Sequence, residues 1–328
     1  MLKIICTGDS HTWGQGASDV REKFDTPWVA GELRPVDFNT GSYVNVLRRM
    51  VESATDSHSW QWHARELAQL AGCSYTAPCA ELNGDFQITF RGALLRLFLG
   101  PQQETVHWIL SLDGKDQELV CSPAKTSNDF RILNFHLPEG EHILMLKKEF
   151  GTLQLHRLES YAGFAAVINC GIGSCPTFRF REQFWNDYAV ALKPDIVLAE
   201  AHTINDWLSG DSPETYRKNL TNLLTDFRTL GAEPILMTVA PIGGPQRLPQ
   251  TADDYEAYLT ASRLAAKDSG AILCDANAVM KQMIAGMTTE EAFQHLLDDN
   301  WHPNDRGHAI YAALLAQALG QLIQIPIF

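Results

Sequence analysis

The chain has 328 residues, more than the roughly 100–150 of a typical domain, so its length predicts two units or one α/β unit with a large insertion. Hydrophobic residues make up 45% and charged residues 20%, as in ordinary globular proteins, which argues against intrinsic disorder. The formal net charge of −13 disfavours binding to nucleic acid or anionic membranes and favours a small neutral or hydrated substrate.

The cysteines and the two termini bear on the cellular compartment. The chain has seven cysteines and no CxxC pair, so neither a zinc site nor a disulfide framework is predicted. Cys170 and Cys175 could meet in space, but buried free thiols are the favoured interpretation. The N-terminus lacks the long apolar stretch of a signal peptide, and the C-terminal run AIYAALLAQALGQLIQIPIF indicates a packed amphipathic helix rather than a membrane span. We therefore expect a cytoplasmic protein.

The first predicted element is a buried strand over residues 2–6, which ends at a Gly-Asp turn. A polar loop follows to about residue 39, and helices are predicted over 42–53 and 60–71, the second closed by Gly72. From residue 82 to residue 159 the pattern changes to short alternating runs separated by turn signals such as LDGK and PEG. This pattern is typical of an antiparallel β-sandwich.

Strands and helices alternate again in the last half of the chain. Strands are predicted over 164–169, 195–200, 234–239 and 271–274, and helices over 213–230, 253–267 and 289–297. Asn304 or Asp305 caps a last helix. The alternation on both sides of the β segment predicts one α/β domain with a parallel sheet, made of residues 1–75 and 160–328 and interrupted by a β-sandwich over 76–159.

The segment GDSHTWG, Gly8 to Gly14, directly follows the first predicted strand. Open parallel sheets bind ligands outside the carboxyl ends of their strands, so Ser10 lies where a reactive group is expected. A serine hydroxyl needs a neighbouring base to act as a nucleophile. A turn with a capping serine is the structural alternative.

The segment DNWHP, which begins at Asp299, supplies a candidate base near the other end of the chain. Asp299 lies three residues before His302, so its carboxylate can reach Nδ1 while Nε2 takes a proton from Ser10. Donors for a developing oxyanion are expected from the glycine-bent loop in VINCGIGS, residues 167–174, and from Asn205 in the segment TIND.

These four segments, in this chain order, resemble the four blocks of the SGNH (GDSL-type) hydrolase superfamily over residues 1–75 and 160–328. The resemblance implies a three-layer α/β/α, flavodoxin-like fold with a parallel sheet and neither a metal nor an organic cofactor. It makes Ser10 the nucleophile, with its own N–H in the oxyanion hole. It further makes Asn205 an oxyanion donor, His302 the base and Asp299 the orienting carboxylate.

Two positions depart from the family's pattern. The glycine of the second block falls on Ser174, one place after Gly173, so the N–H of either residue is a candidate oxyanion donor. Thr203 replaces the glycine of the usual Gly-x-Asn-Asp, which bears on loop shape and pocket size more than on catalysis.

Several other residues adjoin these motifs. The tryptophans beside the motifs, Trp13, Trp207 and Trp301, either stack on a sugar or pack in a core. His11 either lines the pocket or has no role in it. The candidate substrate-lining residues are His11, Trp13, Trp207 and Trp301, while Trp108 in the β segment is expected in a core. A metal cluster of Asp299, His302, Asp305 and His308 is disfavoured because HxxxxxH is not a usual ligand spacing.

The β segment over 76–159 is similar, less specifically, to the jelly-roll modules that accompany SGNH-type carbohydrate esterases. We therefore predict a serine esterase that removes small acyl groups, with acetyl expected, from a small-molecule or oligosaccharide ester through an acyl-enzyme. No cofactor, nucleic acid or membrane partner is expected, and a homo-oligomer is left open. The alternatives are a lipid or aryl esterase, an acyltransferase of the same superfamily, and a non-catalytic glycan-binding protein.

Overall fold

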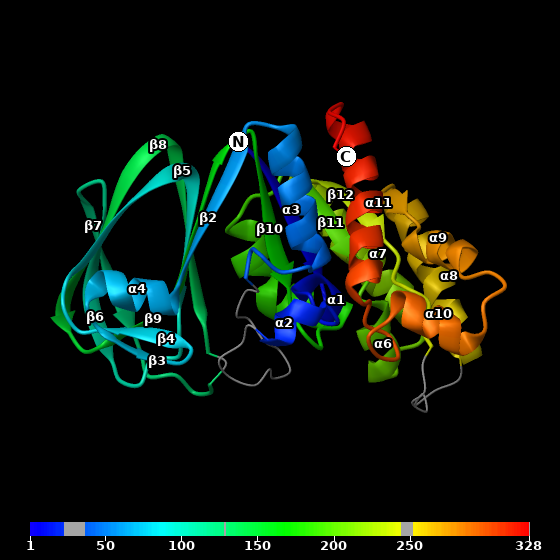
Figure 1. Cartoon of the computed structure of the whole chain (residues 1–328), viewed down its shortest axis with the longest axis horizontal. Coiled ribbons are helices and arrows are strands. Elements are labelled where there is room, and N and C mark those ends of the chain that lie inside the picture. The colour runs from blue at the N-terminus through cyan, green and yellow to red at the C-terminus, as the bar shows by residue number, and fades with distance from the viewer. Residues whose placement is uncertain (23–36, 128, 244–251, 328) are drawn as a thin grey trace. The chain divides into compact units, whose positions relative to one another are not determined.

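The computed structural model describes residues 1–22, 37–127, 129–243 and 252–327, which divide into two compact units (Figure 1). Residues 2–22, 37–55, 167–243 and 252–327 belong to an α/β unit, and residues 56–127 and 129–166 to a β-rich unit. The prediction began the β-rich unit at residue 76. Residues 56–75 group with this unit because their strand and helix pack on its sheet.

A five-stranded sheet forms the centre of the α/β unit, in the order β10-β1-β11-β12-β13. These strands are β1 (Leu2–Gly8), β10 (Ala165–Gly171), β11 (Ile196–Glu200), β12 (Glu233–Met237) and β13 (Ile272–Cys274). The pairs from β1 to β13 are parallel. Residues 196–199 read IVLA and are all buried, as expected of a central strand that is covered on both faces. The strands predicted in this unit are confirmed to within about two residues.

Helices connect these strands, and the longer ones pack in pairs, α3 with α11 and α7 with α8. Ser212 caps α7 by accepting from Thr215 N–H, and Asn304, one of the two predicted caps, accepts from the first turn of α11. The helices are α2 (Ser18–Glu22), α3 (Tyr43–Ala54), α7 (Pro213–Thr229), α8 (Ala252–Ser269), α9 (Ala276–Met283), α10 (Thr289–Leu296) and α11 (Asp305–Ile323). Within the described ranges, no helix is long and apolar enough to cross a membrane.

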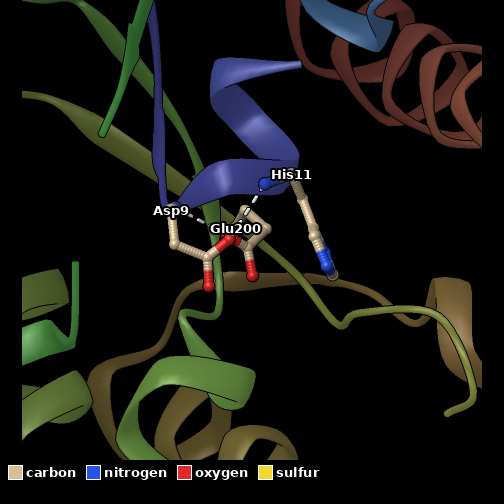
Figure 2. Close-up of side chains that lie close together, drawn as sticks. All are labelled: Asp9, His11 and Glu200. Carbon is tan, nitrogen blue, oxygen red and sulfur yellow. Dashed lines mark hydrogen bonds between the residues drawn. The ribbon is translucent and has the colours of Figure 1, made fainter. Parts of the chain in front are cut away.

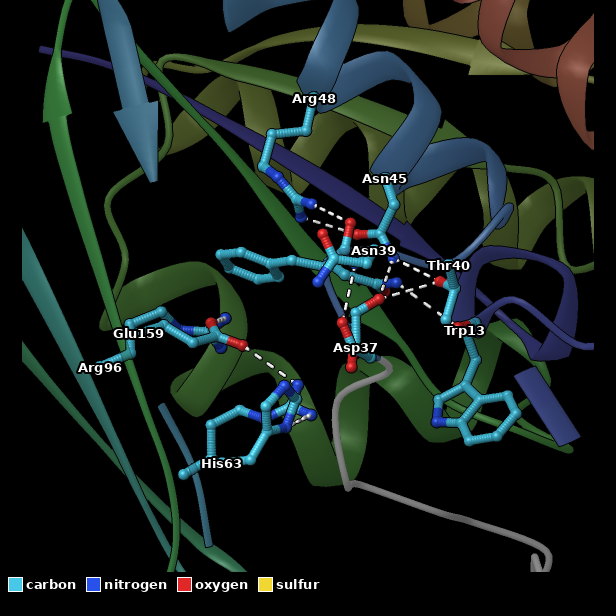
Figure 3. A network of polar contacts seen from close by, with 12 residues as sticks. Trp13, Asp37, Asn39, Thr40, Asn45, Arg48, His63, Arg96 and Glu159 are labelled. Carbon is cyan, nitrogen blue, oxygen red and sulfur yellow. Dashed lines mark hydrogen bonds and ion pairs between the residues drawn. The ribbon is translucent and has the colours of Figure 1, made fainter. Parts of the chain in front are cut away.

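Short elements lie at the carboxyl ends of three of these strands. They are α1 (Ser10–Trp13) after β1, α6 (Thr203–Ser209) after β11, and α5 (Thr177–Arg179) after β10, the last followed by π-helical turns over Phe180–Phe184 and Asn186–Val190. Residues 37–40, which precede α3, are held by side chains of that helix (Figure 3). Asn45 Nδ2 donates to Asp37 O and Thr40 Oγ1, each at 2.6 Å, and Arg48 Nη1 donates to Asn45 Oδ1 at 2.7 Å.

The β-rich unit contains a single antiparallel sheet in the order β3-β4-β9-β5-β8-β6-β7, with β2 also paired to β9. Because all eight strands join one curled sheet, the predicted sandwich of two stacked sheets is not confirmed. Its elements are β2 (Ser57–His63), α4 (Ala64–Ala71), β3 (Ser74–Thr76), β4 (Cys79–Leu82), β5 (Phe86–Leu99), β6 (Val106–Leu112), β7 (Lys115–Cys121), β8 (Arg131–Phe150) and β9 (Leu153–Gly163).

Two local predictions in this unit were wrong. The helix predicted over 60–71 starts only at Ala64, because residues 57–63 alternate along an edge strand that pairs with β9. The PEG segment at 138–140, predicted as a turn, lies within the long strand β8. Gly92 of β5 pairs with Gly140 and Leu94 with His136, so β8 has two extra residues here and its turn-forming residues form a β-bulge opposite Gly92. A Cβ on Gly92 would lie 2.6 Å from Tyr161 O, which explains why glycine occupies this position.

The core of the β-rich unit lies inside the curl of its sheet. Leu67 and Ala68 of α4 pack there against strand residues, and Trp108 is fully buried, as predicted. The unit also contains a buried ion pair, in which Arg96 Nη1 lies 3.0 Å from Glu159 Oε2 (Figure 3). Tyr161 OH donates to the same oxygen at 2.9 Å, so the buried carboxylate is well satisfied.

Candidate active site

Three of the predicted side chains form one hydrogen-bonded chain in the α/β unit. Ser10 Oγ lies 2.8 Å from His302 Nε2, and His302 Nδ1 lies 2.7 Å from Asp299 Oδ2. Ser10 is in the first turn of α1, directly after β1, and the other two lie in the loop between α10 and α11. Residues separated by almost 300 positions are thus brought together at the carboxyl edge of the sheet.

The backbone of the 297–303 loop holds His302 in place. Leu297 forms a β-bridge with Pro303, and Asp298 N–H donates to His302 O at 2.9 Å. Asp299 Oδ1 accepts from the N–H groups of Trp301 and His302, at 3.1 and 2.9 Å. Burial works against ionisation of Asp299, but its hydrogen bonds and charge interaction with His302 outweigh burial and lower its pKa to about 2.

This geometry fixes the histidine tautomer. Because the ionised Asp299 can only accept, Nδ1 of His302 carries the hydrogen of the 2.7 Å bond. Nε2 is then left to accept the hydroxyl hydrogen of Ser10 across 2.8 Å. The arrangement is able to remove a proton from Ser10 as its oxygen attacks an electrophile, and to stabilise the resulting imidazolium.

The predicted oxyanion donors come from two other loops. Asn205 lies in the first turn of α6, and its Nδ2 donates to Asp9 Oδ2 at 2.7 Å, which leaves a second N–H on the same nitrogen. The loop after β10 lies against the loop after β1, because Ile172 N–H donates to Gly8 O at 3.1 Å. In that loop Ser174 has a φ of +54°, a left-handed conformation that glycine adopts most easily.

Asp9 and Glu200 form a buried carboxyl pair beneath the site, which the sequence analysis did not predict (Figure 2). Burial, and next the negative charge of Asp9, raise the pKa of Glu200 well above its ordinary value. Burial also opposes ionisation of Asp9, but the side chains of His11 and His202 and the hydrogen bond from His11 N–H lower its pKa. Ionised Asp9 and protonated Glu200 are therefore the favoured forms of the pair. A glutamate at the end of the apolar run IVLA was the available sequence signal.

Ligand atoms of Asp9, His11 and Glu200 lie within 4.8 Å of one another, which is close enough to consider a cation. Each carboxylate oxygen of the two acids, however, already accepts a hydrogen bond from an N–H group. The set therefore fits an internal hydrogen-bonded cluster better than an open coordination site.

The four residues proposed from the sequence to line the substrate site differ in exposure. Trp207 is fully buried and packs 5.3 Å from the Tyr255 ring, so it is a core residue, and the substrate-lining prediction was wrong for it. His11 is also fully buried, with its ring 5.4 Å from that of His302, and burial lowers its pKa to about 4. It is a neutral neighbour of His302 and not a lining residue. Trp13 is buried, whereas Trp301 is half-buried.

A cavity of about 240 Å³ lies beside the loop that carries Asp299 and His302. Gly243 at its wall donates its N–H to Asn300 O at 2.9 Å, which joins the cavity wall to that loop. The lining is mainly apolar and consists of Pro241, Ile242, Gly243, Ile284, Met287, Thr289, Ala292, Phe293, Leu296 and Leu297.

Asp206, the residue after Asn205, is another buried acid that the sequence analysis did not single out. Burial raises its pKa to about 7, although its Oδ2 accepts from both N–H and Oγ1 of Thr177 at 2.8 Å. At Asp206 the folded protein therefore binds one more proton than the unfolded chain between pH values of about 4 and 7. The stability that this proton provides is lost as the pH rises through that window.

We expect Asp206→Asn to remove this pH dependence. Wild-type protein is expected to lose about 2–3 kcal/mol of unfolding free energy between pH 5 and pH 8 through Asp206, a loss that the neutral amide avoids. Urea unfolding of both proteins at the two pH values measures it, because any pH-independent cost of the substitution cancels in the difference. Parallel pH profiles of the two proteins would contradict the assignment.

The chain matches the model of the GDSL-like lipase/acylhydrolase family over residues 150–310. This segment contains Asn205, Asp299 and His302, and Ser10 precedes it. No curated protein sequence matches the chain.

Among solved structures, a peptidoglycan O-acetylesterase is similar over 99% of this chain and 92% of its own, with 14% identity and a TM-score of 0.52. An acetylxylan esterase from Geobacillus stearothermophilus is similar over 48% of this chain and 73% of its own, with 23% identity and a TM-score of 0.40. The family match and the shared fold agree with the sequence resemblance. The chain contains a GDSL-like lipase/acylhydrolase domain, whose family model it matches over residues 150–310.

Proposed function

We propose that the protein is a serine esterase in which Ser10 is the nucleophile, His302 the general base and Asp299 the residue that orients His302. The observation that carries this proposal is the continuous hydrogen-bonded chain from Ser10 through His302 to Asp299, at 2.8 and 2.7 Å. These residues lie in a chain whose family hydrolyses acyl esters, and their geometry suits that chemistry.

In the proposed mechanism Ser10 Oγ attacks the ester carbonyl carbon while its proton moves to His302 Nε2. The tetrahedral intermediate collapses as the ester C–O bond breaks, and the leaving alcohol takes the proton from His302. Water then attacks the acyl-enzyme with His302 again as base, which releases the carboxylic acid and restores Ser10. We assign the oxyanion to the N–H of Ser10, the side-chain amide of Asn205 and a backbone N–H of Gly173 or Ser174.

We propose acetyl groups on a carbohydrate as the substrate class. The resemblance to SGNH-type carbohydrate esterases supports this choice, and the similar peptidoglycan O-acetylesterase makes an O-acetylated glycan the first substrate to test. The acidic chain, with its net charge of −13, also favours a neutral glycan over a polyanionic one.

A lipid or aryl esterase is the second candidate, because the cavity beside the His302 loop is mainly apolar. Chain-length preference separates the two candidates. Rates on p-nitrophenyl esters that fall from acetyl to octanoyl, together with acetate release from acetylated oligosaccharides, support the acetyl-carbohydrate assignment. Rates that rise toward octanoyl, without acetate release from any glycan, contradict it.

Asn205→Ala is expected to lower kcat by about 10²–10³ and to leave KM nearly unchanged, because an oxyanion donor acts on the transition state. Steady-state kinetics with p-nitrophenyl acetate measure both constants. Asn222→Ala is a matched control, since it removes a half-buried side-chain amide from α7, a helix that carries none of the proposed catalytic residues. A loss confined to KM would argue against the oxyanion role of Asn205.

A further inference from the structure

Glu200 joins the backbones of the two loops that carry Ser10 and Asn205. Its Oε2 accepts from Asp9 N–H at 2.9 Å, and Asp9 immediately precedes Ser10. Its Oε1 accepts from His202 N–H at 2.9 Å, and His202 is the N-cap of α6, the helix that carries Asn205. One carboxyl group therefore bridges the starts of α1 and α6.

A second connection runs through the side chain of Asp9. Its Oδ2 accepts from Asn205 Nδ2 at 2.7 Å, and its Oδ1 accepts from His11 N–H at 3.0 Å. The carboxyl groups of Asp9 and Glu200 point toward the same place (Figure 2). The amide of Asn205 is therefore held by Asp9, and Asp9 is held in turn by Glu200.

The burial of the Glu200 carboxyl group reduces the stability of the fold, so a compensating role in the site is expected. Glu200 is fully buried at the end of β11, where the preceding residues 196–199 are apolar and buried. Placing an acid there costs desolvation free energy, and an apolar residue of similar size would avoid that cost. Burial and the Asp9 charge raise the pKa of Glu200 well above its ordinary value, and a protonated carboxyl can donate to Asp9 while accepting the two backbone N–H groups.

We propose that Glu200 is a positioning residue that sets the distance and orientation of Asn205 relative to Ser10, directly through the two loop backbones and indirectly through Asp9. The proposal rests on the proposed esterase function and adds a residue that does not itself touch the substrate. A donor held in this way needs no reorganisation when the oxyanion forms, which is the condition for effective transition-state stabilisation.

A double-mutant cycle on Glu200 and Asn205 tests the proposal. In purified full-length protein, Glu200→Leu is expected to lower kcat for p-nitrophenyl acetate by about 10–100-fold with KM changed less than about threefold. If Glu200 acts through Asn205, adding Glu200→Leu to Asn205→Ala lowers kcat by no more than about a further threefold. Losses that multiply in the double variant would show that Glu200 does not act through Asn205.

Two further variants separate positioning from general stability. Glu200→Gln keeps the size, one acceptor and a donor toward Asp9, so it is expected to recover kcat to within about tenfold of wild type. It also replaces Glu200→Leu in the cycle if the leucine variant does not fold. Leu198→Ala, at a buried position of the same strand, is expected to lower the melting temperature and to leave kcat at 25 °C unchanged.

The outcomes for the two proposals can be told apart. A wild-type protein whose turnover does not depend on Ser10 would contradict the esterase assignment itself. Ser10-dependent turnover with multiplying losses, or with a kcat of Glu200→Leu equal to that of wild type, would contradict only the role of Glu200.

Discussion

Replacing Ser10 by alanine is expected to lower kcat for an acetyl ester by about 10⁴–10⁶, the largest effect of any substitution considered for this protein. The reason is that the proposed nucleophile, the hydroxyl 2.8 Å from His302 Nε2, is removed while the surrounding loops stay intact. Initial rates with p-nitrophenyl acetate measure the loss, and circular dichroism together with the melting temperature checks that the variant is folded.

A Ser10→Ala variant that is folded and retains even a tenth of the wild-type rate would contradict the role of Ser10 as nucleophile. Residual activity at the level of about 10³-fold over the uncatalysed reaction is compatible with that role, because oxyanion donors and substrate binding contribute without the nucleophile.

Asp299→Asn is expected to lower kcat by about 10⁴. An amide at this position can donate to His302 Nδ1, which selects the tautomer with hydrogen on Nε2 and leaves that nitrogen unable to accept from Ser10. Because the pKa of Asp299 is about 2, the carboxylate stays ionised across the pH range in which activity can be measured. The loss in the variant is therefore expected to be nearly constant between pH 5 and pH 9.

Asp298→Asn is the matched control for this prediction, since the side chain is adjacent, exposed and changed in the same way. Equal losses in the two variants would indicate a general effect of charge or loop stability. A loss confined to Asp299→Asn supports its specific hydrogen bond to His302 Nδ1, at 2.7 Å.

The geometry of Ser10, Asp299 and His302 could be predicted from the sequence because each residue lies in a loop directly after a recognisable strand or before a capped helix. Parallel strands place such loops at one edge of the sheet, so local patterns were enough to bring residues 10 and 302 together. The strand and helix alternation likewise predicted the α/β unit, since buried parallel strands such as IVLA have a clear apolar signature.

Glu200 and Asp206 could not be assigned from the sequence, because their roles depend on which loops the fold brings next to them. The sequence around Glu200 does not indicate that its carboxyl group accepts hydrogen bonds from the N–H groups of both Asp9 and His202. The burial of a side chain likewise depends on parts of the chain far away in sequence. Trp207 and Trp301 each lie next to a motif residue, yet Trp207 is fully buried and Trp301 is half-buried.

The strands of the β-rich unit were predicted, but the points at which one strand ends and the next begins were not. Turn-forming residues usually separate strands, and here Pro138 and Gly140 lie within one long strand instead, at a bulge opposite Gly92. A bulge and a turn call for the same residue types, so composition alone does not distinguish them. The presence of strands therefore followed from the sequence more reliably than their lengths, their connections and the number of sheets.

The most direct test of the central claim is to identify the residue that forms the covalent adduct. A fluorophosphonate should react with wild-type protein so that Ser10 Oγ bonds to phosphorus as the phosphorus–fluorine bond breaks and fluoride leaves. Peptide mass spectrometry is expected to find the added mass on Ser10, to find none in Ser10→Ala, and to show much slower labelling in His302→Ala. Adduct on a different residue, or labelling of Ser10→Ala at the wild-type rate, would contradict the account.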